Sequence, residues 1–398
     1  MTRVVNALVL DGDTIRARLL SERTHSQTHV HIDWLRFTVQ RRLAPTPSVD
    51  NLFPLYELTT SPEDFKSQRL HRLLLEIPDC DQHVSKQAWE LAERVSAILG
   101  PEFAPLQTIL KGHDFYRFRW SIQRAGVEVG WVGFMSSSSS PRQQAQGRTI
   151  HVNLYGTACT FAQHGWTDQM ASLCDELNAD ITRTDLALDF FDGLPGGFES
   201  IVGDYKAGLC DVGGKRPKCN QVGDWINGHE RSFYLGSKEA GKQTNVYEKG
   251  DQLYGPEAGS LWHRIELRYG NKLRVIPSDV LRRPADFFAG ASEWHKLMLA
   301  QAEPLQSPEP IKTTARLRDE SVQAEVTRNL RWAFNTAAPT IAAAWKHMGD
   351  RFLDLVTGTT LPGRLQRFTE QELSSAFAVV AERFTPSGGY TPPAFQTA

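Results

Sequence analysis

Acidic side chains occur in a pattern that could bind a metal ion, in a segment that reads ITRTDLALDF at residues 181–190. Because successive side chains of a β-strand point to opposite faces, Arg183, Asp185 and Asp189 share one face and most of the apolar residues share the other. The two aspartates would lie about 13–14 Å apart along the strand, so both could reach one ion only if the strand bends. Asp185 is therefore the preferred ligand, and Asp189 is a second candidate.

A second segment, LWHRIELRYG at residues 261–270, carries two cations and a carboxylate on one face. The same alternation places Arg264, Glu266 and Arg268 together, with Ile and Leu side chains opposite. Glu266 and Asp185 supply hard oxygen ligands of the kind that Mg²⁺ and Mn²⁺ prefer. We therefore predict a divalent-metal site on the polar face of a sheet, with arginines that could hold phosphate groups.

A tyrosine and a lysine share a face in a third segment, NVYEKG at residues 245–250. Tyr247 beside a divalent ion could attack a phosphodiester and Lys249 could help to hold the phosphate, so both are candidate catalytic residues. Tyr234, thirteen residues earlier on a neighbouring strand, is the rival nucleophile. Periodicity alone leaves a plainer interpretation open, since alternating charges usually mark a solvated sheet face and a tyrosine usually packs.

The elements that must position these residues are short strands followed by a helical region, which predicts an α+β chain. Alternation and β-forming residues predict strands at 31–39, 112–135 as a hairpin, 149–156, 181–190, 231–236, 244–250 and 261–269. Helical spacing predicts helices at 86–99, 160–177, 311–356 and 369–384. We expect three regions: a polar lead-in at 1–28, a sheet-bearing domain at 29–305 and a helical region at 306–398.

Composition excludes several classes of protein. The chain has 398 residues and 44 Lys or Arg against 46 Asp or Glu, so it is not a polybasic protein that coats nucleic acid, although a local basic face is allowed. Its apolar runs are too short to predict a membrane span. Five scattered cysteines without a CxxC pair fit neither a disulfide framework nor a zinc site, which favours a reducing cytoplasm.

Five segments in order resemble the replication initiation factor family, the Rep_trans-type rolling-circle initiators of plasmids and filamentous phages. The resemblance covers about residues 31–292, and the YEKG sequence is more similar to the phage branch. The segments that carry it are Asp33-Trp34-Leu35 with Phe37-Thr38, residues 182–189 (TRTDLALD), 234–237 (YLGS), 246–250 (VYEKG) and 262–267 (WHRIEL).

The resemblance implies an RRM-like antiparallel sheet of the nicking-endonuclease kind, with the active site on its open face. It also implies a metal-dependent enzyme that nicks and rejoins origin DNA through a 5′-phosphotyrosine intermediate. In this family the tyrosine of the R-x-Y-x-K strand is the nucleophile, which corresponds to Tyr247 here. The family's acidic residues correspond to Asp185 and Glu266, with Mg²⁺ or Mn²⁺ as the implied cofactor.

The implied partner is origin DNA, single-stranded or cruciform at the nick, in the cytoplasm of a bacterial host. A host helicase and a second copy of the chain are further expected partners. No GxxxxGK[ST] sequence occurs, so an ATP-driven helicase activity is not expected of this chain itself. The phosphates of the DNA would be held by five cationic side chains, namely Arg183, Arg264, Arg268, Lys238 and Lys242.

Two features of the sequence complicate this interpretation. The family's arginine two residues before the tyrosine is Asn245 here, which keeps alive a rival function: a catalytically silent DNA-binding regulator or replisome recruiter. His29 and His31 also spell the His-hydrophobic-His pattern that other rolling-circle nucleases use for metal. Because they lie far in sequence from the acidic strands, we expect them to be surface residues.

Overall fold

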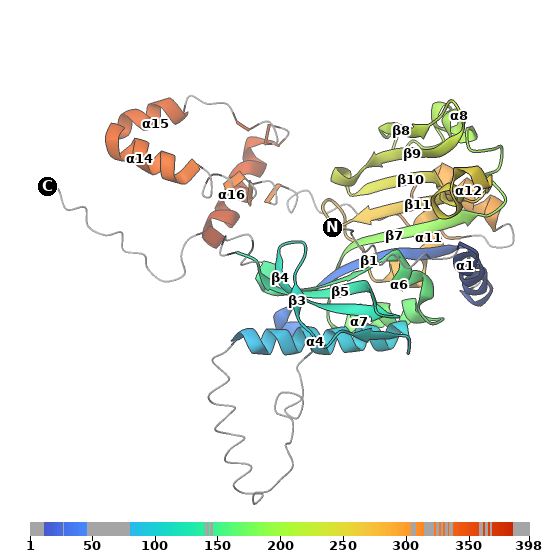
Figure 1. Cartoon of the computed structure of the whole chain (residues 1–398). Coiled ribbons are helices and arrows are strands. Elements are labelled where there is room, and N and C mark those ends of the chain that lie inside the picture. Colours follow the sequence, from blue (N-terminus) through green and yellow to red (C-terminus); the bar gives the residue numbers. More distant parts are fainter. Residues whose placement is uncertain are drawn as a thin grey trace, which may run out of the picture. The chain divides into compact units, whose positions relative to one another are not determined.

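The computed structural model confirms an α+β chain built on one large antiparallel sheet with helices around it (Figure 1). It describes most of residues 12–313 and parts of residues 322–384. The gaps within these ranges are residues 27, 46–79, 139, 141–142, 144–145, 304–307, 324–325, 328, 331–332, 334–336, 358–360, 363–364 and 367.

The sheet has the order β2-β4-β5-β6-β1-β7-β11-β10-β9-β8, with β3 paired to β4. All described pairings are antiparallel, and the predicted strands and hairpin are all present. The strands are β1 (Val30–Gln40), β2 (Phe103–Pro105), β3 (Leu110–Lys111), β4 (Tyr116–Arg124), β5 (Val127–Ser136), β6 (Thr149–Leu154), β7 (Asp180–Phe190), β8 (Cys219–Asp224), β9 (His229–Ser237), β10 (Lys242–Glu248) and β11 (His263–Gly270).

Helices of the sheet-bearing part are mostly short and follow the strands that they cover. The predicted helix at 160–177 is two helices, because Gly165 adopts a positive φ of 76° between them. The helices are α1 (Gly12–Ser26), α4 (Cys80–Leu99), α6 (Gly156–Phe161), α7 (Trp166–Glu176), α8 (Ser200–Lys206), α9 (Lys249–Tyr254), α10 (Asp279–Arg282), α11 (Pro284–Ala289) and α12 (Glu293–Ala302).

One face of the sheet is apolar and carries the core. Leu186 and Leu188 of β7 are fully buried, as are the alternate apolar residues of β11, β10 and β9. Helices α11 and α12 cover this face, where the Tyr269 hydroxyl donates to the carbonyl of Phe287 and Thr244 is hydrogen-bonded to His295. The predicted alternation is therefore confirmed, and the polar side chains of these strands point to the other face.

Two regions differ from the sequence-based expectation. The lead-in at 1–28 contains helix α1, which packs through Ile15 and Leu19 against Trp262, although residues 1–11 lie outside the described part. The glycine-rich segment at 193–229 contains α8 and the exposed edge strand β8. Neither element shows the apolar periodicity on which the sequence-based predictions depend.

The chain divides into two compact units, residues 1–139 with 143–314, and residues 140–142 with 315–398. The second unit has its own small core around Val326 and Val380 and is helical in its described part. Its regular helices are α14 (Ala338–Met348), α15 (Asp350–Thr357) and α16 (Glu370–Phe384). Within the described residues, every helix is too short or too polar to span a bilayer.

Candidate functional site

Strand register gathers the predicted site residues on the polar face. In the β7–β11 pair, Arg268 lies opposite Asp185 and Arg264 lies opposite Asp189. In the β11–β10 pair, Glu266 lies opposite Asn245, and Arg264 also faces Tyr247. Directly opposed residues of antiparallel strands share a face, so three strands bring these side chains onto one face in neighbouring cross-strand rows.

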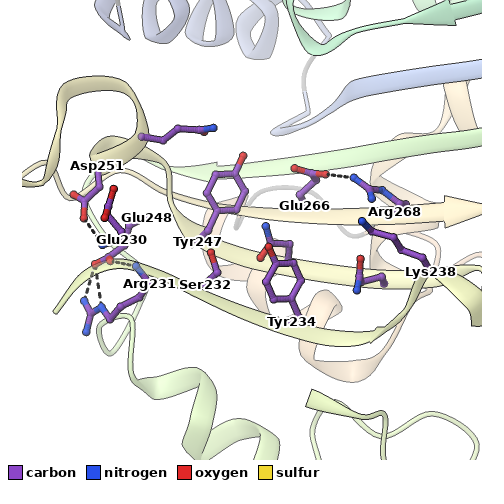
Figure 2. Close-up of a pocket in the computed structure, with 13 residues that line it drawn as sticks. Glu230, Arg231, Ser232, Tyr234, Lys238, Tyr247, Glu248, Asp251, Glu266 and Arg268 are labelled. Carbon is purple, nitrogen blue, oxygen red and sulfur yellow. Dashed lines mark hydrogen bonds and ion pairs between the residues drawn. The ribbon is translucent and has the colours of Figure 1, made fainter. Parts of the chain in front are cut away.

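An open pocket of about 410 Å³ lies over β9, β10 and β11, and we call it the Tyr247 pocket. Figure 2 shows Tyr247 and Glu266 projecting from adjacent strands into it, with Tyr234 and Lys238 on the neighbouring side. Arg268 completes the set of predicted residues in its lining. The structure thus brings both candidate nucleophiles, one candidate metal ligand and two candidate phosphate-binding cations together.

Tyr247 and Lys249 lie side by side at the junction of β10 and α9. The Lys249 ammonium is 5.8 Å from the centroid of the Tyr247 ring. Burial raises the pKa of Tyr247 well above its usual range, and the charge of Arg264 opposes that shift only in part. Burial and then the charge of Arg264 lower the pKa of Lys249 to about 8. Both groups are therefore held toward their neutral forms.

Three carboxylates, Asp33, Asp185 and Glu266, form a group beside the Tyr247 pocket. Burial, together with the negative charges of Asp33 and Asp185, raises the pKa of Glu266 to about 7. The Asp185 carboxylate is buried and accepts hydrogen bonds from Arg183, at 2.9 Å, and from Arg268, at 3.1–3.2 Å. Arg268 also contacts Glu266 at 3.2 Å, so arginines neutralise this carboxylate group in the structure.

The donor set of this carboxylate group suits Mg²⁺ or Mn²⁺, because all its ligands are hard oxygens and a divalent cation would relieve their mutual repulsion. Within the described residues, no three acidic, histidine or cysteine side chains are already gathered as a metal site. Binding an ion would therefore require Arg268 to release Asp185 or Glu266. The residues fit the predicted cofactor in chemistry and charge.

Asp33 is a member of this group to which sequence reasoning assigned no role. It lies on β1 where the register against β7 shifts between Ile32 and Trp34. Such an irregularity changes the alternation of side chains, so simple period-two analysis cannot tell which face Asp33 occupies. Its carboxylate lies 2.7 Å from the Arg264 guanidinium. Only its place in the DWL segment could have singled it out.

Asp189 and Arg264 differ from their predicted roles, because the structure uses them to pair with each other. The Arg264 fork donates to both Asp189 oxygens at 2.7 and 3.0 Å, and the Trp262 indole donates to the same carboxylate at 2.6 Å. Both side chains are at most 3% exposed. Asp189 is thus saturated as a metal ligand, and Arg264 is not free to meet a DNA phosphate.

The histidine pattern at the start of β1 also differs from the expectation of surface residues. The His31 side chain is 12% exposed and lies 3.8 Å from the Asp189 carboxylate. Burial lowers the pKa of His31 to about 4, although the charge of Asp189 opposes the shift. His31 is therefore neutral near pH 7 and forms part of the wall behind the Asp189–Arg264 pair.

Lys242 also differs from its prediction as a DNA contact. It has the same parity along β10 as Thr244 and Val246, which face the helices. Its ammonium donates to the carbonyl of Ala291, between α11 and α12, at 2.7 Å. Burial lowers the pKa of Lys242 to about 8. Lys238, by contrast, is exposed and lines the Tyr247 pocket, so its contact with DNA stays a prediction.

The Asp189–Arg264 pair leads to a prediction about stability. Replacing Asp189 by asparagine leaves a buried guanidinium with Asp33 alone, so the free energy of unfolding should fall by about 3 kcal/mol. The Asp192→Asn variant is the matched control, because that exposed carboxylate should cost less than about 0.5 kcal/mol. Urea unfolding of both variants, followed by tryptophan fluorescence, measures the difference.

The same pair sets a pH dependence. Burial opposes ionisation of Asp189, but the charges of Arg264 and His31 outweigh it and lower its pKa to about 2. A carboxylate with a depressed pKa stabilises the fold above its unfolded pKa of about 4 and loses that contribution as the pH falls through 2. The stability difference between wild type and Asp189→Asn should therefore shrink from pH 4 toward pH 2, and a constant difference would contradict the assignment.

Comparison with protein families agrees with the resemblance found in the sequence. The family model described as replication initiation factor matches residues 179–358, which include β7, β9, β10 and β11. This match begins after the DWL segment and continues past residue 292 into the helical region. A solved structure of a rolling circle replication initiator protein from Geobacillus stearothermophilus is similar at 17% identity and a TM-score of 0.40, covering 71% of this chain and 99% of its own. No curated protein matches the chain.

Proposed function

We propose that this chain is a rolling-circle DNA replication initiator that nicks and rejoins origin DNA through Tyr247. The observation that carries the proposal is the placement of Tyr247 and Glu266 on adjacent strands, facing one open pocket, inside the region that the family model matches. A tyrosine, the Glu266 carboxylate and cations in one pocket are parts that transesterification of a phosphodiester requires.

In the proposed reaction the Tyr247 hydroxyl attacks the scissile phosphorus, an O–P bond to tyrosine forms and the bond to the 3′-oxygen breaks. The products are a 5′-phosphotyrosine and a 3′-oxygen that takes a proton from solvent. Lys249, whose pKa of about 8 keeps part of it neutral near pH 7.5, would accept the tyrosine proton; its nitrogen is 5.8 Å from the centroid of the Tyr247 ring. Because the phosphodiester energy is conserved in the adduct, rejoining needs no ATP.

Asp185 and Glu266, with Asp33 beside them, are the residues that would hold Mg²⁺ or Mn²⁺. When bound, the ion would stabilise the charge that develops on the phosphate oxygens. The arginines on these carboxylates, Arg183 and Arg268, would then be free to bind backbone phosphates. In this proposal metal binding favours DNA binding. An ion on the carboxylates would release Arg183 and Arg268, and the DNA phosphates would replace the carboxylates as their partners.

The test is a nicking assay on the supercoiled replicon that encodes the protein. Reactions run with and without Mn²⁺ are quenched in detergent and probed for protein-linked DNA. We expect a metal-dependent open circle with a covalent adduct. Tight binding to origin DNA with neither nick nor adduct would contradict the proposal and support the regulator instead.

One observation favours that second candidate, a catalytically silent DNA-binding regulator or replisome recruiter. Asn245 stands where the family has an arginine, and its side-chain oxygen is buried with no hydrogen-bond partner among the described residues. Because an asparagine side chain is neutral, this position adds no positive charge near Tyr247. A host helicase, a homodimer, a plasmid or phage as the host element and the bacterial cytoplasm stay predictions.

A further inference from the structure

A second pocket, of about 550 Å³, lies on the polar face beside the Tyr247 pocket, and the proposed mechanism uses only Arg183 and Arg268 of its lining. Its lining includes the side chains of Arg36, Arg183, Lys238 and Arg268, and we call it the cation pocket. Lys238, Gln243 and Arg268 line both pockets. The two pockets therefore form one continuous surface across the sheet.

Cationic residues outnumber carboxylates in the lining of the cation pocket, although Arg183 and Arg268 also pair with Asp185 and Glu266 outside that lining. Asp114 is the one carboxylate in its lining, and it pairs with Arg36 at 3.0 Å. Lys238 is exposed and forms no ion pair within the described part of the chain. A concave surface lined by cations, among which Lys238 has no carboxylate partner in the described residues, attracts a polyanion such as a phosphodiester backbone.

A strained turn places an aromatic ring at the edge of this pocket. Asp114 and Phe115 both have positive φ angles, of 50° and 73°, and a bulky residue is rare in that conformation. The turn is fixed by hydrogen bonds from Gln146 to the Asp114 carbonyl, at 2.8 Å, and from Ser137 to the Phe115 carbonyl, at 3.0 Å. As a result Phe115 is 59% exposed while it lines the cation pocket.

The wall of the pocket contains a buried polar atom without a partner. The Nε2 atom of His151 makes no hydrogen bond to any described residue, and the ring lies between Tyr116 and Trp131, with centroid distances of 5.6 and 5.1 Å. Strained backbone and unpaired polar atoms concentrate where proteins bind ligands. Both features occur here in one pocket, together with the exposed ring and the cations.

We propose that the cation pocket binds a nucleotide of the unpaired DNA strand that flanks the scissile phosphate. Its base would stack on Phe115, and its phosphates would lie against Lys238 and Arg36. The strand must be single-stranded there. Phe115 can stack on a base only if a neighbouring base of a duplex does not already cover that face. This inference rests on the proposed function for its ligand, and it adds the path that the strand takes away from Tyr247.

The test uses the full chain and two fluorescent 20-mers of equal charge, oligothymidylate and an abasic strand. Phe115→Ala should bind oligothymidylate about 5- to 100-fold more weakly and the abasic strand almost as wild type does, because only stacking is lost. Phe115→Gly should do the same with the backbone strain removed, and Phe115→Trp should retain binding. The matched control is Leu297→Ala, an exposed apolar residue on the opposite, helix-covered face.

Salt dependence tests the phosphate contact separately. Lys238→Ala should reduce the slope of log K against log salt by about 0.7, whereas Lys296→Ala on α12 should leave it unchanged. The inference is overturned if Phe115→Ala and Phe115→Gly bind oligothymidylate like wild type, or if they lose both strands equally. Absence of nicking by wild-type protein, with Phe115-dependent binding intact, would instead overturn the proposed function alone.

Discussion

Replacing Tyr247 by phenylalanine should abolish the covalent protein–DNA adduct and lower the nicking rate by at least roughly 10³-fold. The reason is that only the hydroxyl can form the O–P bond, and removal of a covalent nucleophile acts on this scale. The phenyl ring keeps its contact with the Lys249 ammonium, so the free energy of unfolding should change by less than about 1 kcal/mol. Denaturing gels of the quenched reaction measure the adduct directly.

Tyr234→Phe is the matched control for this experiment. Tyr234 lies opposite Asn245 in the β9–β10 pair and lines the same pocket, so the same chemical change is made at the second tyrosine of that pocket. That variant should form the adduct at nearly the wild-type rate. An adduct that persists in Tyr247→Phe and disappears in Tyr234→Phe would transfer the nucleophile to Tyr234.

Replacing Glu266 by glutamine should reduce metal-dependent cleavage by about 10²- to 10³-fold and leave DNA binding largely intact. Loss of one charged ligand weakens ion binding, and the ion contributes several kcal/mol of charge stabilisation to such a reaction. The variant should also need a higher Mn²⁺ concentration to reach half of its own maximal rate. A titration of nicking rate against Mn²⁺, with DNA binding measured in parallel, tests both effects.

Glu230→Gln is the control, because Glu230 is an exposed carboxylate that lines the Tyr247 pocket away from the carboxylate group. Its Mn²⁺ titration should match that of wild type. Asp185→Asn should resemble Glu266→Gln in cleavage, but it also removes a charge partner from Arg183 and Arg268, so its urea midpoint must be checked. Cleavage at the wild-type rate in Glu266→Gln would contradict the metal assignment.

The strands of the site could be predicted because their sequences alternate clearly. In 181–190 and 261–270 most of the apolar residues fall on the parity opposite to the charged ones, so the polar face follows from strand geometry. The shared face of the carboxylates Asp185 and Glu266 is therefore encoded in local pattern. The order of the strands is not, because pairing depends on contacts between segments distant in sequence.

The sequence does not show which of its charged residues are buried. Asp189 and Arg264 read as a solvated metal ligand and a phosphate contact, yet α1 and Trp262 close over this end of the face and the two charges pair. The prediction of Lys242 as a DNA contact fails for the same reason, since the sequence does not reveal that the connection between α11 and α12 lies beside it. In each case a contact with a residue distant in sequence decides whether the charged side chain is available to a metal ion or to DNA.

Local sequence pattern is enough to predict the α+β class and the strands that carry Tyr247, Asp185 and Glu266, and it carries the resemblance to replication initiation factors. Three features depend on packing in three dimensions: Asp33 joins the carboxylate group, Asp189 neutralises Arg264, and Phe115 lies at the edge of the cation pocket. These features arise from a register shift, a buried ion pair and a strained turn. Each is fixed by contacts between distant segments, so no local pattern encodes it.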